Sequence, residues 1–137
     1  MSKAYTGGCA CGVVSYEIQG EPMLMTDCQC RQCQRESGTG HGSHVVFKDA
    51  SVKLQGDVTF WQNRGDGGTI KSNAFCTVCG SPVYTMFPEM PDFFGVRAGS
   101  LDEPGRYQPQ MVLWTAAGHG WDQLDQALPK YDKMRPG

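Results

Sequence analysis

The sequence lacks the long hydrophobic runs that cross a membrane or direct export. Its longest apolar run, Met111 to Trp114, has four residues, whereas a bilayer requires about 20. Residues 1–8 contain no apolar stretch of the kind found in a signal peptide. We therefore expect a cytoplasmic protein that does not enter a membrane.

An excess of charge of either sign is also missing. Lys and Arg number 12 and Asp and Glu number 14, which gives a net charge of -2. Proteins that bind nucleic acid or anionic membranes electrostatically present a basic surface, so we expect neither partner. The sequence has no Gly-x-Ser-x-Gly motif, no P-loop and no dinucleotide fingerprint, which removes three common classes of enzyme.

Short segments rich in β-branched and aromatic residues, separated by Gly and Pro, predict a mainly β protein. We predict strands at 13–18, 23–26, 45–47, 52–54, 58–61, 69–75, 83–87, 94–98 and 110–114. Short helices are predicted at 32–37 and 121–128, and hairpin turns at 55–57 and 64–68. The length of 137 residues suits a single domain, 1–137.

Seven cysteines are the most informative feature of the composition. The count is odd and the expected compartment is reducing, so metal binding is a better explanation than disulfides. The cysteines form three groups along the chain: Cys9 and Cys11; Cys28, Cys30 and Cys33; Cys76 and Cys79.

The third group predicts a metal knuckle, in which a tight turn points two sulfurs at one ion. Gly80 follows Cys79 directly and can adopt the positive φ that such a turn often needs. A structural zinc has four ligands, and the first group, which also ends in a glycine, supplies the other two. Cys9, Cys11, Cys76 and Cys79 then form a site that joins distant parts of the chain.

The middle group offers three sulfurs, the number of protein ligands at a catalytic zinc with an open position. Two alternatives remain. The knuckle could pair with two of the middle cysteines and leave Cys9 and Cys11 as free thiols. A histidine could close the middle group as a second structural site; the candidates are His41, His44 and His119.

Three thiolates give zinc a formal charge of -1, which weakens it as a Lewis acid for hydrolysis. Such a soft site suits a thiol as its fourth ligand and would hold that thiol ionised at neutral pH. The chemistry we expect is therefore the making or breaking of a carbon–sulfur bond between a thiol and a small carbonyl compound.

The cysteine groups and their order resemble the glutathione-dependent formaldehyde-activating (GFA) family, which is grouped with the centromere protein V type. The resemblance rests on Gly8–Gly12, Cys28–Cys33 with Ser37 and Gly38, Phe75–Gly80, Trp121, and Leu128–Tyr131. It implies an Mss4-like fold of several short coiled antiparallel β-sheets organised around zinc, with one or two short helices.

The resemblance also implies an activity and its sites. It implies a carbon–sulfur lyase that acts on a thiol–carbonyl adduct such as S-hydroxymethylglutathione, with glutathione as co-substrate. It implies two zinc ions per chain: a structural zinc at Cys9, Cys11, Cys76 and Cys79, and a catalytic zinc at Cys28, Cys30 and Cys33.

This chain departs from the family pattern at one position, because the middle motif usually reads Cys-His-Cys and has Gln29 here. Glutamine cannot exchange protons as a general acid or base. Cations for the carboxylates of glutathione are available, but the sequence does not choose among them: Arg31, Arg35, Arg64, Lys71 and Arg97.

Two other functions remain as alternatives to an enzyme. The chain could be a zinc-stabilised binding or scaffold module without turnover, which the Mss4-like fold also permits. It could instead be a thiol redox switch, in which Cys28, Cys30 and Cys33 oxidise and release the metal.

Overall fold

The computed structural model describes residues 3–136 and confirms the mainly β fold class. Its strands are β1 (Tyr5–Gly8), β2 (Ser15–Gln19), β3 (Pro22–Cys28), β4 (Gly42–Lys48), β5 (Ser51–Gln55), β6 (Val58–Arg64), β7 (Ile70–Cys76), β8 (Pro82–Met86), β9 (Phe93–Arg97) and β10 (Met111–Leu113). The helical elements are α1 (Arg31–Ser37) and three 3-10 turns, η1 (Ala98–Ser100), η2 (Pro104–Arg106) and η3 (Thr115–Ala117).

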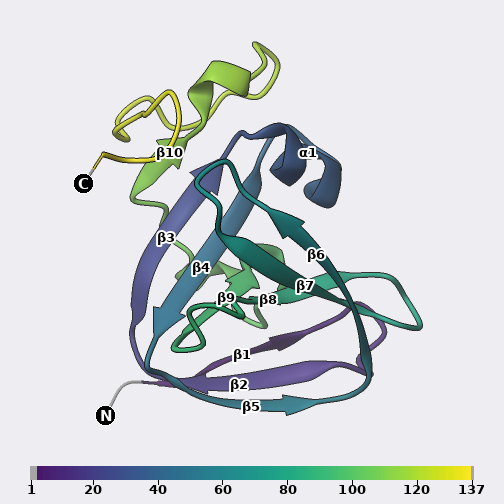
Figure 1. Ribbon diagram of the computed structural model, residues 1–137. Coiled ribbons are helices and arrows are strands. Elements are labelled where there is room, and N and C mark those ends of the chain that lie inside the picture. Colours follow the sequence, from purple (N-terminus) through teal and green to yellow (C-terminus); the bar gives the residue numbers. More distant parts are fainter. Residues whose placement is uncertain (1–2, 137) are drawn as a thin grey trace.

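The strands form two sheets that lie against each other (Figure 1). A three-stranded sheet has the order β1-β2-β5, and a seven-stranded sheet has the order β10-β3-β4-β9-β8-β7-β6. Neighbouring strands are antiparallel except for β10, which pairs with β3 in parallel. The helix α1 lies at the end of the larger sheet that is remote from the smaller sheet (Figure 1).

The core fills the space between the two sheets. Tyr16 and Ile18 of β2 and Val45 and Phe47 of β4 alternate with more exposed neighbours, as expected for strands with one buried face. Ile18, Val45 and Phe47 are fully buried, and the ring of Tyr5 meets that of Phe47 edge-to-face at 5.4 Å. This contact joins the first strand to the larger sheet.

The turn signal at 55–57 is a crossover between sheets, so the prediction of a hairpin there is wrong. β5 pairs with β2 in the smaller sheet, whereas β6 pairs with β7 in the larger one. Gly56 has a φ of 95°, and a Cβ atom there would lie 2.1 Å from the carbonyl oxygen of Val13. The close approach explains why glycine stands at this position. The hairpin predicted at 64–68 is confirmed, with Arg64 opposite Ile70.

The predicted helix at 121–128 is absent from the part of the chain that the structure describes. Its first residue, Trp121, has an exposed fraction of 67%, so this short segment lacks the packed apolar face that would stabilise a helix. The chain then runs beside β10, where the N–H groups of Val112 and Tyr131 donate to the carbonyls of Pro129 and Val112, respectively. Among residues 3–136, no helix is long and apolar enough to cross a membrane.

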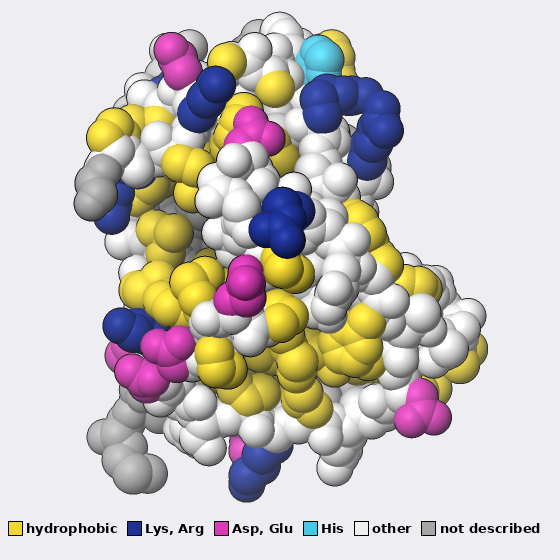
Figure 2. All heavy atoms as spheres, viewed as in Figure 1, with side chains coloured by type: hydrophobic (Ala, Val, Ile, Leu, Met, Phe, Trp, Pro, Cys, Tyr) yellow, Lys and Arg dark blue, Asp and Glu magenta, His cyan; other side chains and the backbone are white. Residues whose placement is uncertain are grey.

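The visible surface agrees with the balanced composition. On the face shown in Figure 2, basic and acidic side chains are interspersed among apolar ones. That face therefore offers no extended basic area of the kind that binds nucleic acid.

Candidate metal centres

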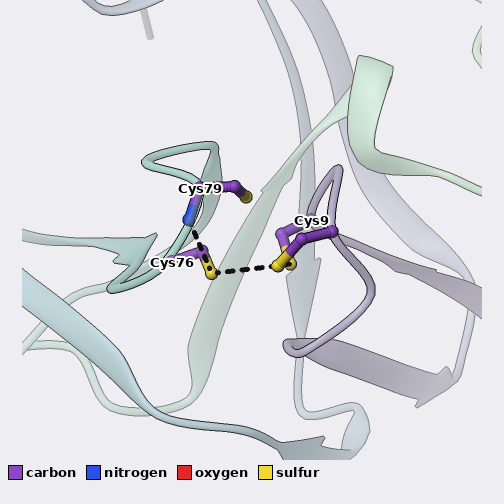
Figure 3. A group of neighbouring side chains, drawn as sticks. Cys9, Cys76 and Cys79 are labelled. Atoms are coloured by element: carbon purple, nitrogen blue, oxygen red, sulfur yellow. Dashed lines mark hydrogen bonds between the residues drawn. The ribbon is translucent and has the colours of Figure 1, made fainter.

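The sulfurs of the first and third cysteine groups meet where strands of the two sheets end. Cys9 and Cys11 lie in the connection between β1 and β2, Cys76 ends β7, and Cys79 lies in the turn before β8. Their four sulfurs are all within 4.8 Å of one another. Figure 3 shows Cys9 facing Cys76 and Cys79 across this group.

The spacing of these sulfurs suits a tetrahedral ion. The Cys9–Cys11 and Cys11–Cys76 sulfur–sulfur distances are 3.6 Å and 3.7 Å. Four sulfurs bound at about 2.3 Å to one tetrahedral zinc would lie about 3.8 Å apart. The donor set and its geometry therefore fit zinc, and they give no support to a pairing of Cys76 and Cys79 with the middle group.

Backbone turns hold the sulfurs in place. Gly80 has a φ of 76° and donates its N–H to the carbonyl of Cys76 at 2.9 Å. The N–H groups of Val78 and Cys79 donate to the sulfur of Cys76 at 3.3 Å and 3.4 Å. This is the geometry that the Cys-x-x-Cys-Gly spacing predicts for a metal knuckle.

Hydrogen bonds also favour the ionised form of two of these cysteines. The hydroxyl of Ser81, 3.2 Å from the sulfur of Cys79, lowers the pKa of that thiol to about 5. The N–H of Val14 donates to the sulfur of Cys9 at 3.3 Å and lowers its pKa. Thiolates are the form in which cysteine binds metal.

The three middle cysteines form a second group where β3 passes into α1. Cys28 ends β3, Cys30 is the N-cap of α1, and Cys33 lies in the first turn of the helix. The three sulfurs are within 4.8 Å of one another. Cys28 and Cys33 are buried and Cys30 is half-buried, so the group has one side nearer to solvent.

Contacts among the three sulfurs and the helix cap act on the ionisation of this group. The sulfur of Cys30 accepts the N–H of Cys33 at 3.2 Å. Hydrogen bonds from the sulfurs of Cys28 and Cys33 lower the pKa of Cys30, whereas the contacts of Cys33 with the sulfurs of Cys28 and Cys30 raise the pKa of Cys33. A cation placed there would favour the ionised form of all three thiols.

His44 is the candidate histidine that reaches the middle group. Its Nε2 lies 3.4 Å from the sulfur of Cys33. Burial lowers the pKa of His44 to about 3, and the nearby Arg97 acts in the same direction, so the ring is neutral at pH 7. His119 instead meets Oε1 of Gln34 through Nε2 at 3.0 Å.

Gln29 points away from the sulfurs into a buried polar network. Its amide Nε2 donates to the carboxylate of Asp122 at 3.1 Å, and Nδ1 of His41 meets the same carboxylate at 3.0 Å. A Cβ atom on Gly118 would lie 2.6 Å from Oε1 of Gln29, so the loop after η3 closes directly over this side chain. Gln29 therefore ties that loop to the middle cysteines.

A pocket of about 420 Å³ lies between α1 and the larger sheet. Arg35 and Glu36 of α1, Trp61 of β6 and Arg97 of β9 line it. Arg97 is largely buried and donates to Glu36 at 3.0 Å. Local sequence patterns do not predict this pocket, because its lining residues come from α1, from strands β6 to β9 and from the turn between β7 and β8. Arg35 and Arg97 are two of the five cations that the sequence leaves unassigned.

Together, the fold and these two cysteine groups define a mainly β protein with one potential four-thiolate and one potential three-thiolate metal centre. Residues 4–117 match the family described as "Glutathione-dependent formaldehyde-activating enzyme". The match covers most of the chain, and the protein belongs to this GFA family.

A solved structure supports the fold. The crystal structure of a Rhodobacter sphaeroides protein superposes with a TM-score of 0.53 at 19% sequence identity. The comparison covers 92% of this chain and 98% of that one. The similarity therefore extends over most of the chain and supports the fold alone.

Proposed function

We propose that this protein is a zinc-dependent carbon–sulfur lyase that acts on a thiol–carbonyl adduct such as S-hydroxymethylglutathione. The observation that carries the proposal is the division of seven cysteines into a group of four and a separate group of three. Membership of the GFA family supports a glutathione-dependent reaction with formaldehyde. We further propose a single domain over 1–137, a cytoplasmic location and two zinc ions per chain.

The two groups have different proposed roles. Cys9, Cys11, Cys76 and Cys79 supply a complete tetrahedral set, so this site would be closed and structural. Cys28, Cys30 and Cys33 supply three ligands and leave a position for substrate. Zinc bound there would supply a soft Lewis acid that favours the ionised form of a substrate thiol.

The remaining chemistry is a reversible addition. In the forward direction, the substrate sulfur forms a bond to the carbonyl carbon, the C=O π electrons move to oxygen, and that oxygen takes a proton from solvent. In the reverse reaction, the hydroxyl group returns its proton to solvent, its oxygen re-forms the C=O bond, and the carbon–sulfur bond breaks with its electron pair on sulfur. The three cysteines hold the site together, and His44 is a neutral neighbour beside Cys33.

The test combines metal content with the exchange rate of the adduct. Elemental analysis should give two zinc ions in the wild type and one in Cys30→Ser. Exchange spectroscopy with ¹³C-formaldehyde and glutathione should show faster adduct formation and breakdown with wild-type protein than with Cys30→Ser. Two zinc ions without any acceleration would refute the enzyme and favour a binding module.

A further inference from the structure

Two buried glutamines of the three-cysteine motif bind the C-terminal part of the chain. Gln29 lies between the first two cysteines of the motif, and Gln34 directly follows the third. Their exposed fractions are only 7% and 5%. Both reach residues 114–122, here called the strap, which begins after β10 and runs beside α1 (Figure 1). The motif that supplies three sulfurs therefore also anchors a segment more than eighty positions away.

The amide of Gln34 binds the strap and the motif at the same time. Its Nε2 donates to the carbonyl of Gln29 at 2.8 Å and to the carbonyl of Ala117 at 3.0 Å. Its Oε1 meets Nε2 of His119 at 3.0 Å and accepts a hydrogen bond from the guanidinium of Arg31. One side chain thus links the peptide group before the second cysteine to two residues of the strap.

Asp122 fastens the far end of the strap to Gln29. Nε2 of Gln29 donates to the carboxylate of Asp122 at 3.1 Å and to its backbone carbonyl at 3.4 Å. Nδ1 of His41 lies 3.0 Å from both carboxylate oxygens, and only 9% of the Asp122 side chain is exposed. A Cβ atom on Gly40 would lie 2.4 Å from the Cβ of Asp122, so only glycine at position 40 leaves room for this contact. Hydrogen bonds to a carboxylate are stronger than those between neutral groups, so we expect this contact to hold the strap most firmly.

The strap also covers part of the cysteine group itself. Trp114, its first residue, packs against the buried cluster that contains Cys28 and Cys33. Release of the strap would therefore bring water to a side of the group that is now buried.

We propose that Asp122 is a positioning residue of the three-cysteine centre and that it acts through Gln29. Because Gln29 stands between two cysteines, a fixed Gln29 side chain also fixes the backbone that carries two of the three sulfurs. The inference rests on the proposed function for the identity of the metal, but the hydrogen bonds that hold the strap require no metal. Docking of the strap and retention of zinc are then coupled, and the loss of either weakens the other.

Zinc release from the zinc-loaded full chain to an excess of the chelator 4-(2-pyridylazo)resorcinol tests this coupling. The release phase that Cys30→Ser lacks belongs to the three-cysteine centre. This phase should be about tenfold faster in Asp122→Ala than in the wild type. Asp122→Asn keeps one acceptor oxygen for Gln29 and should give an intermediate rate. An unchanged rate in Asp122→Ala, or equal acceleration of the phase that belongs to the four-cysteine centre, would overturn the proposal.

Asp125→Ala is the matched control, because it removes a carboxylate from the same stretch of chain. The carboxylate of Asp125 accepts the N–H of Ala127 at 2.9 Å and is exposed. This variant should release zinc as the wild type does. Acceleration equal to that of Asp122→Ala would show that any disturbance of this stretch is sufficient, and the specific role of Asp122 would be refuted.

A double variant tests whether Asp122 acts through Gln29. Gln29→Ala and Asp122→Ala remove the same contact, so the double variant should release zinc no faster than the faster of the two single variants. If the two accelerations multiply instead, Asp122 does not act through Gln29 and the proposal fails.

Alkylation by iodoacetamide separates the positioning role from the lyase activity, because it reports on the cysteines with or without bound metal. Mass spectrometry should show faster labelling of the peptide that contains 28–33 in Asp122→Ala, with labelling of 76–79 unchanged. If so, but the wild type holds one zinc ion or does not accelerate adduct exchange, the positioning role stands and the lyase proposal fails. If the wild type holds two zinc ions and accelerates exchange, while Asp122→Ala is labelled and releases zinc as the wild type does, the lyase stands and the positioning role fails.

Discussion

The two cysteine groups should contribute very differently to stability, because they join different lengths of chain. We compare two variants. The first is a double variant that carries both Cys9→Ser and Cys11→Ser and removes half of the four-cysteine group. The second is Cys30→Ser, which removes one sulfur of the three-cysteine group. Each variant leaves two of the original sulfurs in the altered group. Each should therefore lower the zinc content from two ions per chain to one.

The expected magnitudes follow from the separation of the ligands. Cys11 and Cys76, whose sulfurs are 3.7 Å apart, are separated by 65 positions in the chain. Closing a loop of this length removes chain entropy from the unfolded state worth about 4 kcal/mol. The middle group spans only 28–33, for which the same relation gives about 2 kcal/mol. For a chain of this size, the two losses correspond to melting temperatures lower by roughly 14 °C and 7 °C.

Calorimetric melting of the zinc-loaded proteins, with elemental analysis of the same samples, checks this asymmetry. The double variant should melt well below Cys30→Ser. Cys30→Ser should lose adduct exchange while remaining the more stable of the two. Equal decreases in melting temperature, or a larger decrease in Cys30→Ser, would refute the reasoning from loop length.

Three further predictions concern the fold. Burial raises the pKa of Tyr16 from 10 to about 12, so the contribution of its neutral form to the unfolding free energy is complete below pH 10 and is lost as the pH rises to 12. Urea denaturation of the wild type should show a fall in unfolding free energy of roughly 2–3 kcal/mol across this window, and Tyr16→Phe should not show it. Parallel pH curves for the two proteins would contradict this prediction. Phe47→Ala, at a fully buried position, should cost about 3–5 kcal/mol in the same assay, and a loss below 1 kcal/mol would show that the core is not where we place it. Gly56→Ala should destabilise the protein by at least about 1–3 kcal/mol, because Gly56 has a positive φ and its added Cβ atom would approach the carbonyl of Val13. Gly67→Ala, whose added Cβ atom would meet nothing within 4 Å, should remain within about 0.5 kcal/mol of wild type. Similar melting of the two variants would argue against a tight crossover.

Local patterns in the sequence predict the cysteine groups well, because metal knuckles are built from short turns. The Cys76–Gly80 turn adopts the geometry expected from its spacing, with a positive φ at Gly80. Strands such as β4 and β8 are recognisable because their β-branched and aromatic residues pack into the core. The assignment of zinc to both groups remains a prediction for the elemental analysis to test.

Features that depend on pairing between distant segments cannot be predicted from local sequence patterns. A glycine at position 56 fits a hairpin and a crossover equally well, and which of the two forms depends on whether β5 pairs with β2 or with β6. β1 was not predicted, because two of its four residues are glycines and pairing with β2 holds it in the sheet. The contact of His44 with Cys33 likewise arises from the β3–β4 pairing, which places Gly42 opposite Cys28.

The parallel pairing of β10 with β3 has a consequence for biogenesis. The four sulfurs of the first centre are all present once residue 79 has been synthesised, and the three middle sulfurs exist even earlier. The middle group has β4 as an early neighbour, but it acquires its second neighbouring strand only with β10, and Asp122 reaches Gln29 later still. During synthesis, one side of the middle group therefore remains uncovered while most of the protein is being made. Metal capture at the four-cysteine centre can precede completion of the site beside α1 on each nascent chain.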